Sequence, residues 1–155
     1  MKKLSLIFLI LCTICPVLAT EYASLKYDQV NMRTGPGERF PIKWVYQEKN
    51  YPLEVLDSFE LWRQVRDKEG DVGWIHQNQL KDVRYVLITK EDALLKKIGE
   101  SRSVAILQPG VIARLERCPK GNYCRLSVQS DDEKYTGWFL RSSLWGITPG
   151  EIIER

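Results

Sequence analysis

Histidine, cysteine and an excess of charge of one sign are all scarce in this sequence. The 155 residues include one histidine, His76, and four cysteines, and 23 basic side chains nearly balance 20 acidic ones. One imidazole with two thiols makes a poor zinc site, so no metal or other cofactor is expected. Bases and acids are interleaved, without the basic clusters typical of nucleic-acid binders, so nucleic acid is not an expected partner.

Long apolar runs are also few, and the one that stands out lies at the N-terminus. Two lysines precede an apolar run at residues 4–15, and a small-residue cleavage site ends at Ala19. The run has about a dozen residues, fewer than the roughly 18 that span a bilayer. We expect residues 1–19 to be a signal peptide, cleaved after Ala19, and the protein to be exported to the periplasm or cell envelope without stable membrane insertion. An uncleaved N-terminal anchor is the alternative.

Signal cleavage would leave an almost neutral chain with two cysteines. The formal net charge falls from +3 to +1, because Lys2 and Lys3 leave with the signal. Cys118 and Cys124 then bracket a turn-rich stretch, and an oxidising compartment favours a disulfide between them. Closing so short a loop stabilises the fold by roughly 2–3 kcal/mol on the chain-entropy model.

The rest of the sequence predicts an all-β protein. Short runs rich in β-branched and aromatic residues alternate with turn clusters such as Gly35-Pro36-Gly37 and Asp67–Asp71. The predicted strands are Tyr22–Tyr27, Val30–Arg33, Ile42–Tyr46, Leu53–Phe59, Trp62–Arg66, Val72–His76 and Tyr85–Ile88.

An internal repeat of about 60 residues divides the chain into two modules. Trp62–Val65 corresponds to Tyr123–Leu126, Gly73-Trp74-Ile75 to Gly137-Trp138-Phe139, and Leu80 to Leu144. Upstream, Val30–Arg33 aligns with Ala93–Lys96. The boundaries expected from this register are a first domain at 20–82, a second at 83–146 and a C-terminal tail at 147–155.

Residues 89–98 carry two conflicting signals. Thr89 is a candidate helix N-cap, and the apolar residues at Leu94, Leu95 and Ile98 have helical spacing. The repeat register predicts an extended strand and loop instead. We favour the strand, because helix propensity alone is a weak guide.

These motifs resemble the bacterial SH3-like domain. The turn sequence Val-Asn-Met-Arg-Thr-Gly-Pro-Gly at residues 30–37 is followed by Trp62-Arg-Gln-Val and Gly73-Trp74-Ile75. The stretches "RFPIKWVYQ", "GWIHQNQL" and "LWGI" are similar to a family of exported bacterial proteins with tandem SH3-like modules. The resemblance implies two small, strongly bent β-barrels and a binding role without catalytic chemistry. The second copy is degenerate, because its loop at 97–100 lacks Gly-Pro-Gly.

The Gly-Pro-Gly loop is the first candidate site. A phosphate-binding loop needs GxxxxGK[ST], or GxGxxG before a helix, whereas here Glu38 follows the glycines. A type II turn, with positive φ at Gly37, is the favoured interpretation. The loop is also where a small barrel offers a binding rim. The candidate ligand-binding residues are Arg33, Glu38, Arg39, Phe40 and Trp44.

The other tryptophans are given structural roles. Trp62 and Trp74 alternate with polar neighbours at barrel-closing positions, so they are predicted to belong mainly to the core, and Trp138 by register. Trp145 is predicted to help pack the two modules together.

The sequence favours a binding protein over an enzyme. The cysteines are expected in a disulfide, His76 is expected at the surface, and no carboxylate pair stands out. Two partners follow from the resemblance: peptidoglycan or its stem peptides, or a protein of the envelope that an adaptor would recruit. A narrow groove faced by Arg33 or Arg39 would favour an anionic stem peptide, and a broad apolar patch would favour a protein.

Overall fold

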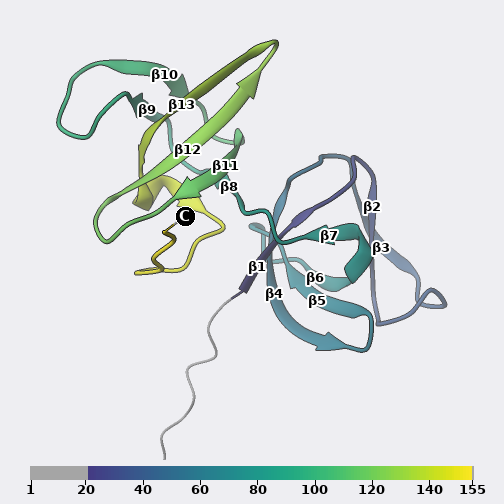
Figure 1. Ribbon diagram of the computed structural model, residues 1–155. Helices are drawn as coiled ribbons and strands as arrows, with labels where there is room; N and C mark the ends of the chain where they lie inside the picture. The colour runs from purple at the N-terminus through teal and green to yellow at the C-terminus, as the bar shows by residue number, and fades with distance from the viewer. Residues whose placement is uncertain (1–20, 155) are drawn as a thin grey trace, which may run out of the picture.

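The computed structural model describes residues 21–154, which form two antiparallel β-sheets in succession along the chain (Figure 1). The predicted signal peptide and its cleavage site lie outside the described residues. Among residues 21–154 no helix is long and apolar enough to cross a membrane. The all-β prediction is confirmed, and the two sheets are the two SH3-like modules.

The first module is a seven-stranded sheet in the order β3-β2-β6-β5-β4-β1-β7. Its elements are β1 (Glu21–Leu25), β2 (Val30–Arg33), β3 (Ile42–Tyr46), β4 (Pro52–Phe59), β5 (Trp62–Arg66), β6 (Val72–His76), a 3-10 turn η1 (Gln77–Gln79) and β7 (Leu80–Lys81). Strands β2, β3, β5 and β6 have the predicted bounds. Strand β1 ends at Leu25 rather than Tyr27, because the next amide, Lys26 N, donates to Gln79 O in the turn before β7.

The second module repeats this topology, with sheet order β10-β9-β13-β12-β11-β8-β14. Its elements are β8 (Tyr85–Ile88), β9 (Asp92–Leu95), β10 (Ser103–Leu107), β11 (Ile112–Arg117), β12 (Tyr123–Ser130), β13 (Glu133–Leu140), a 3-10 turn η2 (Arg141–Ser143) and β14 (Leu144–Trp145). Each element occupies the place of its counterpart seven strands earlier. The repeat inferred from the sequence is therefore a repeat of the fold, and residues 92–95 form a strand.

One part of the predicted repeat register is wrong by one residue. Strand β2 meets β6 at Arg33 and Trp74, and β9 meets β13 at Leu95 and Trp138, so Arg33 corresponds to Leu95. The predicted alignment put Lys96 there. Since Leu94 and Leu95 are both apolar, hydrophobicity could not distinguish the two registers, although a one-residue shift exchanges the faces of a strand.

Each sheet curls around its own apolar core. The first core consists of Leu25, Val30, Met32, Tyr46, Leu53, Val65 and Ile75. The second contains the corresponding strand residues and is larger, with Phe139, Leu126, the two cysteines and Ile147 among its members. The larger core allows residues beyond β14 to pack onto the second module.

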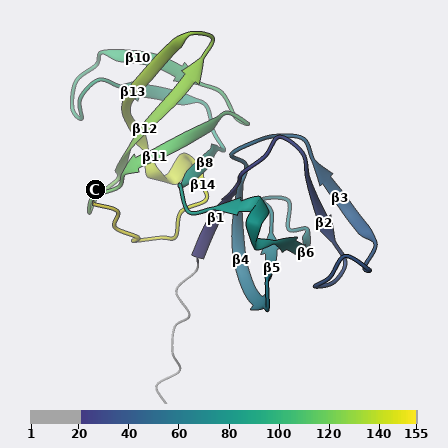
Figure 2. The same ribbon diagram turned by 45° about the vertical axis from the view of Figure 1, so that its right-hand side comes forward.

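The modules meet at β1 and β8, as both views of the ribbon show (Figures 1 and 2). The Tyr85 amide donates to Ser24 Oγ at 3.2 Å, and the Tyr22 ring meets the Trp145 indole edge-on, with centroids 5.6 Å apart. The predicted role of Trp145 at the module junction is thus confirmed.

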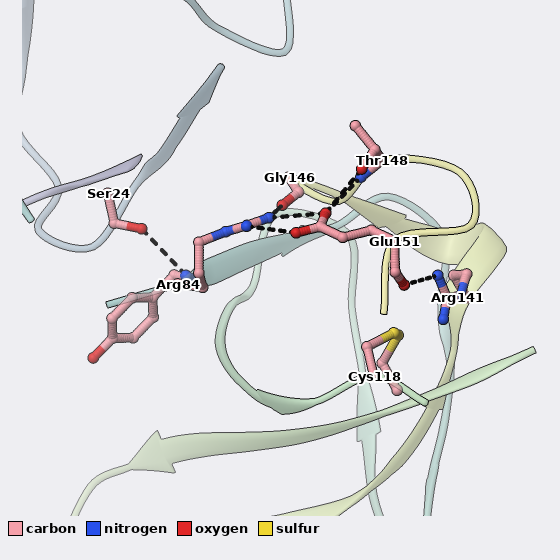
Figure 3. Close-up of polar contacts among 9 residues, drawn as sticks. Ser24, Arg84, Cys118, Arg141, Gly146, Thr148 and Glu151 are labelled. Atoms are coloured by element: carbon pink, nitrogen blue, oxygen red, sulfur yellow. Dashed lines mark hydrogen bonds and ion pairs between the residues drawn. A yellow bond between two sulfur atoms is a disulfide. The ribbon is translucent and has the colours of Figure 1, made fainter. Parts of the chain in front are cut away.

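The last residues return to the junction (Figure 3). Glu151 pairs with Arg84 at 2.7 Å and accepts hydrogen bonds from the amide and hydroxyl of Thr148. Burial alone would raise the pKa of Glu151, but the hydrogen bonds from Arg84 and Thr148 outweigh it and hold that pKa below its ordinary value of 4.5. The tail is thereby fixed to the segment between the two modules.

Candidate functional site

The Gly-Pro-Gly loop closes on its own backbone. Gly37 N donates to Gly35 O at 3.0 Å, and Phe40 N donates to Gly37 O at 3.2 Å. The prediction of a turn is correct, but the type II assignment is wrong, because Gly37 does not have a positive φ. Glycine is needed at position 35 for another reason: a Cβ there would lie 2.5 Å from the Phe40 ring.

Three of the five predicted ligand-binding residues form one cluster in this loop. Arg33 Nη1 donates to Phe40 O at 2.8 Å, and the Arg39 guanidinium lies 5.3 Å from the centre of the Phe40 ring. Glu38 is exposed at the turn. Arg33 therefore holds the loop, and Trp44 lies apart from the cluster, on β3.

Trp44 borders a different site, a shallow pocket of about 560 Å³. We call it the acidic-aromatic pocket. Its rings come from Trp44, Tyr46 and Tyr51, and its carboxylates come from Glu48, Asp67, Glu69 and Asp71. The lining contains neither Arg33 nor Arg39, so the feature that would favour an anionic ligand in the first module is not found there.

Two tyrosine hydroxyls order the acidic side of the pocket, and that of Tyr46 makes its hydrogen bond in a buried position while that of Tyr51 does so in an exposed one. Tyr46 donates to Asp67 Oδ2 and Tyr51 to Glu69 Oε2, each at 3.1 Å, while their rings stack with centroids 5.5 Å apart. Burial, followed by the neighbouring carboxylates, raises the pKa of both tyrosines well above the ordinary value of 10.0. Both phenols therefore stay neutral and act as donors.

Cations compensate only part of this negative charge. Lys43 Nζ lies 3.0 Å from Asp71, and Lys68 Nζ lies 3.6 Å from Glu69. Both pairs are solvent-exposed and hence weak. The pocket thus combines aromatic walls with carboxylates, an arrangement that suits a cationic group carried on an apolar stem.

Sequence reasoning placed Trp44 beside Tyr46, with Tyr51 nearby, as a possible groove, but it missed the carboxylates that complete this pocket. Tyr46 and Tyr51 flank the turn between β3 and β4, and Asp67–Asp71 is the turn between β5 and β6. The second turn was recognisable as polar, but only the curling of the sheet brings the two turns together.

The prediction that Trp62, Trp74 and Trp138 form the core is wrong. The inward positions of their strands are taken by Val65, Gly73, Ile75 and their counterparts, and the three indoles are half-buried on the outer faces. The alternation of apolar and polar residues shows which side chains share a face of a strand. It does not show which face is inside, because Val65 and Ile75, on the opposite face from the tryptophans, are apolar too. Trp62 instead packs edge-on against His76, with centroids 5.3 Å apart.

His76 and the cysteines have structural partners. His76 Nδ1 accepts a hydrogen bond from the Asn78 amide at 3.3 Å, which caps η1. Cys118 and Cys124 form a disulfide, as predicted. Among residues 21–154 no three His, Cys, Asp or Glu side chains are grouped so that they could hold a metal ion.

The first module can be compared with known domain families. A model of the family described as "Bacterial SH3 domain" matches residues 26–82. Residues 26–82 are therefore similar to the bacterial SH3 domain. The matched segment comprises β2 to β7 and includes the acidic-aromatic pocket. The second SH3-like module lies outside the matched residues and is related to the bacterial SH3 domain by its identical strand order.

Comparison with whole proteins adds little to this assignment. Among solved structures, the chain is similar to NlpC2 and NlpC1 from Trichomonas vaginalis, each at 12% identity and a TM-score of 0.37. The similarity to NlpC2 covers 82% of this chain and 48% of that protein, and the similarity to NlpC1 covers 84% and 47%. This chain therefore spans about half the length of either protein. No curated protein matches the chain. Similarity at this level carries no argument about function.

Proposed function

We propose that this protein is an exported, non-catalytic binding module of the cell envelope that recognises peptidoglycan through its stem peptides. Bacterial SH3 domains commonly bind peptidoglycan or proteins, which supports a role at the cell wall. The stem peptide is proposed to bind at the acidic-aromatic pocket of the first module. The protein would act in the periplasm or on the envelope, after cleavage of its signal peptide.

The composition of the pocket is the observation that carries this proposal. A stem peptide contains a diamino acid, whose side-chain ammonium sits at the end of an aliphatic chain. The aliphatic part would pack against the exposed indole of Trp44, and the ammonium would approach Glu69 and Asp71. The ligand group proposed here is therefore a cation, whereas Arg33 and Arg39 suggested an anionic group.

Strand β3 adds a second means of recognising a peptide. It stands at the edge of its sheet, paired with β2, and Trp44, Val45 and Tyr46 line the pocket from it. An extended peptide can pair with such an edge through main-chain hydrogen bonds while its side chains enter neighbouring pockets.

An adaptor role is the second candidate function. Phe59 and Leu61 are each more than half exposed in the hairpin between β4 and β5, close to Leu56. Exposed apolar side chains gathered in this way are typical of protein-binding surfaces. A wall enzyme or another envelope protein would be the partner of this hairpin.

Co-sedimentation with isolated peptidoglycan sacculi tests the proposal. Purified protein should pellet with sacculi in a saturable manner. Trp44→Ala should reduce the bound fraction strongly without unfolding, because the side chain is 55% exposed. Phe59→Ala, which removes a ring of similar exposure from the hairpin, is the matched control and should bind normally.

The opposite pattern would support the adaptor. If Phe59→Ala loses binding to an envelope partner while neither variant nor wild type pellets with sacculi, the peptidoglycan proposal is wrong. Equal pelleting of wild type and Trp44→Ala would place the wall-binding site away from the acidic-aromatic pocket.

A further inference from the structure

The second module carries a groove whose lining is strongly basic. A cavity of about 610 Å³ lies over the outer face of β11, β12 and β13, between the inter-module segment and the tail. Five of its lining residues are cations and one is a carboxylate: Arg84, Arg114, Arg117, Arg125, Lys134 and Glu116. We call this the basic groove.

Strand register explains why these cations face outwards together. Arg117 lies opposite Arg125, and Arg125 lies opposite Trp138, so the three side chains form a row across β11, β12 and β13. The intervening Leu115 and Leu126 point to the core. The Arg117 guanidinium stacks over the Trp138 ring, 5.5 Å from its centre.

The charges of the groove are poorly balanced. Arg84 is already paired with Glu151, and Glu116 Oε1 is shared between Arg114 and Lys134, each 3.7 Å away. Within residues 21–154, neither Arg117 nor Arg125 has a carboxylate within 4 Å. Two arginines directly opposite each other across a strand pair destabilise the sheet, so folding alone does not account for them.

The positive region continues onto the first module. A second hollow shares Arg114 and Lys134 with the groove and is also lined by Lys49, with Glu48 as its one carboxylate. Nearby, burial and then the positive charges of Lys49 and Arg114 lower the pKa of Lys81. Cations from both modules thus face one another in a chain that is nearly neutral after loss of its first residues.

We propose that the basic groove is a second ligand site, which binds an acidic peptide through its carboxylates. Guanidinium groups bind carboxylates in a bidentate geometry, and Arg117 and Arg125 are free to do so. Glu116 favours a peptide over a phosphate as the ligand of the groove. Its carboxylate, whose pKa is lowered by the Ser127 hydroxyl and the flanking cations, can accept a hydrogen bond from a peptide N–H, a donor that a phosphate lacks. This site is independent of the acidic-aromatic pocket.

Calorimetric titration of the purified protein with N-acetylated tetraglutamate tests the site. The double variant Arg117→Gln/Arg125→Gln should weaken binding by at least about tenfold, the equivalent of ~1.4 kcal/mol. The variant Lys90→Gln/Lys97→Gln removes the same charge from the same module outside the groove and should stay within about twofold of wild type. Raising the salt concentration should weaken wild-type binding, and saturation should shift the Trp138 indole N–H signal.

Other outcomes overturn the inference. Equal weakening of binding by both double variants would show that the net charge of the protein, and not the basic groove, determines the affinity. Binding of pyrophosphate or of anionic phosphatidylglycerol vesicles in preference to the peptide would contradict the role of Glu116. If tetraglutamate does not bind, the proposal that the basic groove binds acidic peptides is wrong. That result would not affect the Trp44 test of the first module.

Discussion

At the scale of single residues, buried polar contacts shape the candidate site. Asp67 is a buried carboxylate of the first module, and it accepts hydrogen bonds from the Tyr46 hydroxyl and the Asp71 amide. A buried charge is tolerated when donors satisfy it. The same contacts hold the turn between β5 and β6 beside β3, so the stability of the module and the shape of its pocket depend on one network.

Replacing Tyr46 by phenylalanine tests this network. The Tyr46→Phe variant should lose about 1.5–3 kcal/mol of unfolding free energy, the contribution typical of a hydrogen bond to a charged group. Chemical denaturation at neutral pH measures the loss. A variant as stable as wild type would show that Asp67 does not need the phenol.

The same variant has a predicted pH dependence. The pKa of Tyr46 is raised in the folded protein, so unfolding releases a proton above pH 10.0 and stability falls as pH rises beyond that value. The decline should be shallower for Tyr46→Phe by up to about 1.4 kcal/mol per pH unit. Parallel curves for the two proteins would contradict the assigned shift.

Residue-scale sequence reasoning was strongest where only one explanation fits. Cys118 and Cys124 are the two cysteines within residues 21–154, and the structure joins them. The tryptophans were misplaced because alternation reports which residues share a face but not which face is inside, and Val65 and Ile75 compete for the interior. Gly35 was recognised as a turn glycine, although the Phe40 ring, distant by five positions, is what excludes a side chain there.

At the scale of strands, close approach of backbones defines both modules. Gly73 on β6 and Gly137 on β13 occupy equivalent places, and a Cβ on either would come within 2.8 Å of a carbonyl oxygen on the crossing strand. These glycines were correctly aligned from the sequence. The register of β2 and β9 was not, because adjacent leucines at 94 and 95 leave the inward position ambiguous.

Substitution of Gly137 by alanine tests the strand crossing. The new Cβ would lie 2.6 Å from Leu95 O and 2.8 Å from Leu94 Cγ. Gly137→Ala should therefore cost about 1–3 kcal/mol, as overpacking of a core does. Thermal unfolding compares it with Gln129→Ala, an exposed change in the same sheet that should have little effect. Equal stabilities would place β9 farther from β13 than the structure does.

At the scale of the whole molecule, two copies of one fold carry opposite charge at their candidate sites. The sequence predicted the duplication from Gly-Trp motifs about 60 residues apart, and the identical strand orders confirm it. It did not predict the charge division, because the acidic side chains of the first pocket come from separate turns and the basic groove is assembled from three strands, the inter-module segment and the tail.

The most direct test of the central claim is a titration of the purified protein with a soluble stem peptide, followed by amide NMR shifts. A peptide with a free side-chain amine should shift residues 44–51 and 67–71, and the same peptide with that amine acetylated should bind much more weakly. Shifts confined to the hairpin around Phe59, or equal binding of the acetylated peptide, would contradict recognition of an ammonium group by the acidic-aromatic pocket.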